Sequence, residues 1–137
     1  MFPDTITIYN IEDNIYYRKE VKNVFAHTSK IISKDGNGEK YTSVHNVIFS
    51  NLSLNDFVSN NEYKKLSDKS KKFTIKPNDI IVFGIFGEVN SLSDIQKSNI
   101  EYFLIKSIST NQYGNSILQN IEVTDWKLKL NLFCQMI

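Results

Sequence analysis

Residues 1–10, MFPDTITIYN, open the chain with the pattern that decides its fold. The isoleucines alternate with hydroxyl-bearing residues, in the order Thr5, Ile6, Thr7, Ile8 and Tyr9. This period of two predicts a half-buried strand with the isoleucines on its core face. We expect no signal peptide here, because such a peptide needs a basic start and a longer apolar run.

The composition predicts one globular domain that favours strands. A chain of 137 residues is enough for about one domain, and its 41% hydrophobic and 23% charged residues are ordinary for a globular protein. Alanine and arginine occur once each, as Ala26 and Arg18, whereas β-branched and aromatic residues are abundant. The net charge of +1 predicts no strong overall attraction to nucleic acid or acidic membranes. No apolar run is long enough to span a membrane, so we expect no membrane association.

Turn signals divide the chain into short strands. Residues 11–14 have turn chemistry, so residues 15–20 are expected to return beside the first strand, and residues 21–30 to form a third. Residues 34–40, KDGNGEK, form the clearest loop, because Asp-Gly and Asn-Gly pairs tolerate positive φ values. The further extended segments are expected at residues 41–50, 73–75, 80–86, 101–110 and 117–126. A hairpin loop is expected at residues 111–115.

Residues 80–86, IIVFGIF, are apolar enough to be buried on both faces and are expected to form the central strand. A proline-containing turn at residues 76–79 precedes them. Two short helices are also expected, one over residues 61–66 and one ending near Lys97. The candidate helix caps are Ser59, Asn60, Ser91 and Ser93.

These patterns predict a mainly β protein. We expect a small β-barrel or sandwich of about seven or eight short antiparallel strands, with one or two short helices. Residues 1–126 are predicted to form this single β-barrel domain. Residues 127–137 alternate charged and apolar groups, which indicates either an extra strand or a C-terminal arm that docks on a neighbour. The apolar residues of this arm are Leu128, Leu130, Leu132 and Phe133.

The residues that carry chemistry are isolated in the sequence, so we expect no enzyme, metal site or cofactor. His27 and His45 have no His, Cys or carboxylate at ligand spacing, and ordinary surface or partly buried histidines are expected. A single cysteine, Cys134, excludes an internal disulfide, and a structural thiol is a better interpretation than a nucleophile. Gly36 and Gly38 form a Gly-x-Gly that opens no expected helix, so no dinucleotide site is predicted. The carboxylates are scattered, without a pair suited to acid–base catalysis.

Five lysines cluster between residues 64 and 72, namely Lys64, Lys65, Lys69, Lys71 and Lys72. A solvated face needs no partner and is the favoured interpretation. The alternative is a phosphate-contacting patch, which would give DNA affinity that depends on salt and not on sequence. No interleaved basic and aromatic pattern indicates a single-strand binder.

Three segments resemble small proteins encoded in the head–tail gene cassettes of prophages from Gram-positive bacteria. These segments are FPDTITIYN at residues 2–10, IYYRKEV at residues 15–21 with VF at 24–25, and FTIKPNDIIVFG at residues 73–84. The later YGNS at residues 113–116 and IEV at 121–123 resemble the closing hairpin of those proteins. The resemblance covers residues 2–126. Asn78 stands where those proteins usually have glycine.

The resemblance implies a head-closure (stopper) or neck protein of a tailed phage, a β-barrel subunit of a ring that helps retain DNA. It implies a homo-oligomer whose partners are the portal or adaptor protein, the tail-terminator protein and packaged double-stranded DNA. The location implied is the head–tail junction of a virion assembled in the host cytoplasm. Our candidate for a channel or inter-subunit loop is polar and contains glycine. It comprises Ser33, Lys34, Asp35, Gly36, Asn37, Gly38, Glu39 and Lys40.

Two other functions are compatible with the same sequence. Within the same class, the chain could be a tail-terminator or tail-completion protein. From a different class, it could be a small β-barrel module that binds nucleic acid. A ring connector is expected to stay monomeric alone and to assemble on the portal or tail end. A nucleic-acid module is expected to bind free DNA with a steep salt dependence.

Overall fold

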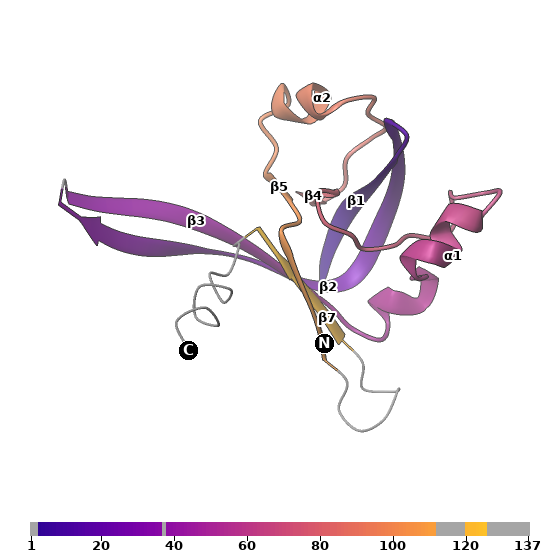
Figure 1. Ribbon diagram of the computed structural model, residues 1–137, viewed down its shortest axis with the longest axis horizontal. Helices are drawn as coiled ribbons and strands as arrows, with labels where there is room; N and C mark the ends of the chain where they lie inside the picture. Colours follow the sequence, from indigo (N-terminus) through magenta and orange to yellow (C-terminus); the bar gives the residue numbers. More distant parts are fainter. Residues whose placement is uncertain (1–2, 37, 112–119, 126–137) are drawn as a thin grey trace.

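The computed structural model describes residues 3–36, 38–111 and 120–125, which form one antiparallel sheet with short helices beside it (Figure 1). The strands are β1 (Asp4–Glu12), β2 (Ile15–Asp35), β3 (Gly38–Phe49), β4 (Ile80–Phe83), β5 (Tyr102–Leu104), β6 (Ser107–Asn111) and β7 (Asn120–Thr124). The helices are the 3-10 helix η1 (Ser53–Asp56), α1 (Asn60–Lys65) and α2 (Leu92–Gln96). The strand order is β5-β4-β1-β2-β3-β7-β6. The predicted mainly β, antiparallel fold with two short α-helices is confirmed.

The first hairpin is closed by a two-residue turn. Asp13 and Asn14 have φ values of 50° and 65°, the left-handed conformation that a type I′ turn requires. After this turn β2 continues for 21 residues, so the two strands expected at residues 15–20 and 21–30 are one strand. Asn23, with φ of 63°, lies where the register with β1 shifts between Asp4 and Thr5. An irregularity of this kind bends a strand without ending it.

One segment of chain forms both edges of the sheet. β5 lies at one edge beside β4, and β6 lies at the other edge beside β7, with only two residues between them. In that connection the N–H of Ile105 donates to the carbonyl of Asp79 at 2.9 Å, and the N–H of Lys106 donates to the carbonyl of Thr124 at 2.9 Å. The strand expected over residues 101–110 is therefore divided into two. The sheet consequently curls into a barrel-like shape.

Apolar residues pack on two sides of the strands. The larger core is made of residues including Ile6, Ile8, Val24, Val47, Phe49, Phe73, Ile81, Phe103, Ile105, Ile121 and Val123. A second core joins Tyr9, Ile80, Val82, Val89 and Ile95, so it links β1 and β4 to the segment that carries α2.

Two predictions about burial are changed by this second core. β1 is buried on both faces over Ile6 to Asn10, whereas a half-buried strand was expected. β4 is buried on both faces as predicted, but it lies second from the edge, and β2 is the central strand. The hydroxyl of Thr7 explains its place in the interior, because it donates to the carbonyl of Gly84 at 2.8 Å and accepts from the N–H of Phe86 at 3.1 Å.

The segment before β4 is held by side chains more than by strand pairing. Residues 73–75 form no strand, contrary to the prediction, and Phe73 makes a single parallel bridge to Phe57. The turn expected at residues 76–79 is present, with Pro77 at its second position and Asn78 at its third with φ of 73°. Asparagine tolerates this conformation nearly as glycine does, so the tight turn forms without glycine.

A buried polar network ties this segment to β1. Asp79 is 2% exposed, and its carboxylate accepts from Lys76 Nζ at 2.6 and 2.8 Å and from Asn10 Nδ2 at 2.8 Å. The amide of Asn10 also donates to the carbonyl of Thr74 at 2.7 Å, and its oxygen accepts from the N–H of Thr74 at 3.1 Å. Burial raises the pKa of the Asp79 carboxyl, and the hydrogen bonds from Lys76 and Asn10 oppose that shift.

Local chemistry explains the short helices. Ser59 precedes α1, and its side chain accepts from the N–H of Glu62 at 3.3 Å, which confirms it as the predicted cap. Ser91 stands at the predicted position before α2, but its side chain makes no capping hydrogen bond to the helix. The carboxylate of Asp94 accepts the N–H of Asn90 at 3.0 Å instead. The hairpin loop expected at residues 111–115 lies outside the described residues except for Asn111. Cys134 and the predicted arm at residues 127–137 also lie outside them.

Two buried tyrosines differ in the partners of their hydroxyl groups. Tyr9 donates to the carbonyl of Gly87 at 2.6 Å, whereas the hydroxyl of Tyr63 has no hydrogen-bond partner among the described residues. We expect Tyr9→Phe to lower the free energy of unfolding by about 1 kcal/mol, because a satisfied hydrogen bond is lost. We expect Tyr63→Phe to leave it unchanged or to raise it by up to about 1 kcal/mol, because a buried unpaired hydroxyl is removed. Urea unfolding of both variants measures the difference, and equal losses would contradict it.

The same tyrosines give a second test at high pH. Burial raises the pKa of Tyr9 to about 12 and raises that of Tyr63 further. Between pH 10 and 12 an unfolded tyrosine loses its proton while Tyr9 keeps it, so folding stability must fall as the pH rises through this range. Tyr9→Phe should therefore reduce the loss of stability in that window. Absorbance at the tyrosinate band, recorded with the unfolding curves, follows the titration.

Candidate functional site

β2 and β3 continue past the rest of the sheet as a two-stranded ribbon, which projects from the body of the protein in Figure 1. The pairing of β1 with β2 ends at Asp4↔Val24, and β7 pairs with β3 only over residues 46–49. Beyond these points eight residue pairs, from Thr28↔His45 to Asp35↔Gly38, join β2 and β3 to each other. At a rise of about 3.3 Å per residue the ribbon is about 25 Å long. Residues 28–45 are called the ribbon from here on.

The predicted channel or inter-subunit loop lies at the tip of this ribbon, but most of it is strand. Ser33, Lys34 and Asp35 belong to β2 and pair with Lys40, Glu39 and Gly38 of β3. Only the turn around Gly36 remains of the loop, and Gly38 has φ of 117°. Asp-Gly and Asn-Gly pairs are typical of such tight hairpins. The chain does turn here, as the sequence predicted, but the loop is shorter than the predicted residues 34–40.

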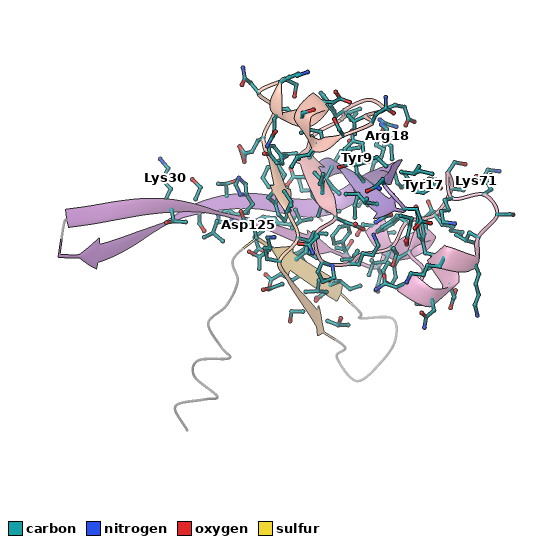
Figure 2. All side chains as sticks on the ribbon, turned by 45° about the horizontal axis from the view of Figure 1, so that its top comes forward. Tyr9, Tyr17, Arg18, Lys30, Lys71 and Asp125 are labelled. Atoms are coloured by element: carbon teal, nitrogen blue, oxygen red, sulfur yellow. The ribbon has the colours of Figure 1, made fainter. Side chains whose placement is uncertain are left out.

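Five described side chains of the ribbon are polar and face solvent, whereas Val44 and His45 at its base are buried and partly buried. Thr28, Ser29, Lys30, Thr42 and Ser43 are all exposed, and Figure 2 shows Lys30 extending from the ribbon away from the body. Two paired strands are at best marginally stable alone. The ribbon therefore depends on contacts at its base or with a partner.

At the base of the ribbon, two carboxylates accept backbone N–H groups at the points where strand pairing stops. Where β1 begins, Asp4 Oδ2 accepts from the N–H of Ala26 at 3.0 Å. Where β7 ends, Asp125 Oδ1 accepts from the N–H of His45 at 2.8 Å. On each edge, a side-chain oxygen takes the place that the carbonyl of a neighbouring strand would occupy.

His45 lies between two carboxylates at the same place. Its Nδ1 is 2.8 Å from Asp125 Oδ2, and its Nε2 is 3.8 Å from Glu101 Oε1. The ring stacks on Phe103 with centroids 5.5 Å apart and meets Phe83 edge-on at 5.6 Å. These contacts make His45 a partly buried structural residue, as expected, while His27 is exposed beside Phe25.

The grouping around His45 was not predicted from the sequence. Asp125 is 80 residues from His45 along the chain, and no local pattern marks this contact. The second ring nitrogen faces the carboxylate of Glu101 instead of a serine or cysteine nucleophile. Within the described ranges, no group of three or more His, Cys, Asp and Glu side chains is placed to hold a metal ion.

The predicted lysine cluster is divided between internal contacts and solvent. Lys69 Nζ lies 5.7 Å from the ring centre of Tyr17 and 5.5 Å from that of Tyr63, and it donates to the carbonyl of Leu66 at 2.9 Å. Lys72 Nζ is 3.8 Å from Asp56 Oδ1. The remaining three lysines, Lys64, Lys65 and Lys71, are exposed.

Lys69 and Tyr17 border two surface hollows of about 340 and 350 Å³. The larger hollow is also lined by Glu12, Asp13 and Lys64. The other is also lined by residues that include Arg18, Asp68 and Glu88. Each hollow thus has two basic and two acidic side chains, which gives no net attraction for a phosphate. The contact of Lys69 with Tyr17 was missed because these residues are far apart in the sequence.

The described residues define a class of protein by their architecture: a curled antiparallel sheet with a long two-stranded ribbon fastened at its base. The chain belongs to a family of unknown function, DUF6751, which matches residues 1–124. No curated protein and no solved structure is significantly similar to it. In the described part of the chain, no helix is both long and apolar enough to cross a membrane.

Proposed function

We propose that this chain is a structural subunit of the head–tail connector of a tailed phage, a head-closure or neck protein. In this proposal it forms a homo-oligomeric ring between the portal complex and the tail and helps to retain packaged DNA. Three segments of the sequence, at residues 2–10, 15–25 and 73–84, support the assignment through their resemblance to such proteins. The mainly β fold agrees with it.

The projecting ribbon is the observation that carries the proposal. Subunits in a ring touch through head-to-tail contacts between two different surfaces. The curled sheet offers little open edge for such a contact, because its edge strands β5 and β6 have only three and five residues. A globular domain of this size has a radius of gyration of about 14 Å. A ribbon of about 25 Å is therefore long enough to reach well across a neighbouring subunit.

Retention of DNA would follow from closure of the channel more than from a basic surface. The net charge is +1, and both hollows beside the lysine cluster have balanced charges. The three exposed lysines, Lys64, Lys65 and Lys71, are too few to supply strong phosphate binding, since each contact adds only a modest, salt-dependent gain. The ribbon tip is the better candidate for an element that enters the channel.

The test is electron microscopy of phage particles assembled with a shortened ribbon. Residues 30–43 are replaced by Asn-Gly, which joins Ser29 to Val44 by a turn suited to paired strands and keeps the buried Val44. The wild-type chain is expected as a ring between portal and tail. The shortened chain is expected to keep its β-sheet circular dichroism and to be absent from the particles, which then lose DNA or fail to join tails.

A matched control changes surface charge without touching the ribbon. The triple variant Lys64→Gln, Lys65→Gln, Lys71→Gln is expected to enter particles as the wild type does. Absence of the wild-type chain from the head–tail junction would refute the proposal, and so would normal incorporation of the shortened chain. Binding of free DNA with a steep salt dependence that the triple variant loses would support the nucleic-acid module instead.

A further inference from the structure

The two edges of the ribbon are fastened by the same device. The edge of β2 is free of β1 after Val24, and the next N–H on that edge, at Ala26, is held by Asp4. The edge of β3 is free of β7 before Asn46, and the adjoining N–H, at His45, is held by Asp125. Carboxylate oxygens form stronger hydrogen bonds than neutral carbonyls do. The ribbon is thus gripped where it leaves the sheet on both sides.

A third carboxylate holds the ribbon from the side of the barrel. Glu101 precedes β5, and its Oε1 accepts from the hydroxyl of Thr28 at 2.6 Å and lies 3.8 Å from His45 Nε2. Thr28 and His45 are the first residue pair of the ribbon. Asp125 also contacts the ring of His45, at 2.8 Å, so this pair is connected to both β7 and the segment before β5. Figure 2 shows Asp125 at the base of the ribbon, on the side of the body.

We infer that Asp4, Glu101 and Asp125 form a three-point clamp that holds the ribbon as a rigid arm in one direction. The ring of His45 and the buried Val44 pack at the base. The two strands beyond them pair only with each other, so the ribbon would swing about its base without further contacts. The clamp places one contact on each edge and one on the first residue pair, so that swinging of the ribbon about its base strains hydrogen bonds to carboxylates. An arm ordered in advance loses less entropy when it binds. The inference is independent of the identity of the partner.

Distances between two spin labels test this inference. Labels are attached at Lys30→Cys on the ribbon and at Lys97→Cys beside α2, in a chain where Cys134→Ser removes the natural thiol. The distance distribution is expected to be narrow in this background. In the triple variant Asp4→Ala, Glu101→Ala, Asp125→Ala it is expected to become about twofold broader, because the arm then samples several directions.

The matched control is Glu122→Ala. It removes the 2.9 Å hydrogen bond that Asn46 Nδ2 of β3 donates to Glu122 of β7, and it leaves the three clamp residues unchanged. Its distribution should stay as narrow as the background. A broad distribution in the background, or a narrow one in a folded triple variant, would overturn the inference.

If the triple variant loses its β-sheet circular dichroism, hydrogen exchange of the single variants Asp4→Ala and Asp125→Ala decides the question. The amides of Ser29 and Val44, which face each other across the ribbon, are expected to exchange about tenfold faster in each than in Glu122→Ala. Equal exchange rates would refute the clamp.

Discussion

Replacing Asp79 with alanine is expected to lower the free energy of unfolding by about 3–5 kcal/mol, because a buried charge loses its partner. Lys76 Nζ lies 2.6 and 2.8 Å from the two carboxylate oxygens, and the side chain of Asn10 donates to the same group. The N–H of Ile11 is a further donor to it, at 3.2 Å. Alanine would leave these groups without their acceptor. Urea unfolding followed by circular dichroism measures the loss.

A double variant separates the effect of the unpaired charge from that of the missing side chain. Lys76→Met with Asp79→Leu removes both charges and keeps apolar volume, so it should recover most of the stability lost by Asp79→Ala. Asp68→Ala is the exposed control and should cause little change, because among the described residues the Asp68 carboxylate accepts hydrogen bonds from Ser70 alone. A loss with Asp79→Ala no larger than with Asp68→Ala would contradict the structural role of the network.

Replacing Phe73 with alanine is expected to lower the free energy of unfolding by about 3–5 kcal/mol through loss of buried area and creation of a cavity. Phe73 is 1% exposed, and its ring centre lies 5.9 Å from those of both Phe49 and Phe57. Strand pairing can compensate little, since Phe73 contributes only one bridge to Phe57. Urea unfolding measures the stability, and near-ultraviolet circular dichroism reports the packing of the aromatic rings.

Phe25→Ala is the matched control for this substitution. Phe25 is 38% exposed and its ring stacks on the exposed His27, so the same chemical change should cost less than about 1 kcal/mol. Comparable losses from the two variants would show that Phe73 does not anchor its segment to the core.

The parts of the fold that depend on neighbouring residues could be predicted from the sequence. The turn at Asp13 and Asn14, the cap at Ser59 and the turn that contains Pro77 each follow from local backbone chemistry. The alternation of residues 5–9 predicted the first strand, and Ile6 and Ile8 do face the larger core.

The parts of the fold that depend on contacts between residues distant in the sequence could not be predicted from it. β2 continues past Asn23 because both β1 and β3 pair with it, and no local signal distinguishes a bulge from a strand end. The segment of residues 101–110 divides because two different strands compete for its backbone. In the clamp, Glu101 contacts Thr28 of β2 although β5 and β2 are not neighbours in the sheet, so this contact forms only when the sheet curls.

The single segment that forms both sheet edges also sets the order in which the chain folds during synthesis. β1, β2 and β3 are neighbours in sequence and can pair as soon as they leave the ribosome. The sheet is not complete until β5, β6 and β7 have been made, and among the described strands β6 pairs with β7 alone. β4 covers the edge of β1 earlier, but until β7 is made the nascent chain carries an open edge on β3, the state in which strands pair with the wrong chain. Completion of Asn120–Thr124 by the ribosome is therefore the step that ends this exposure.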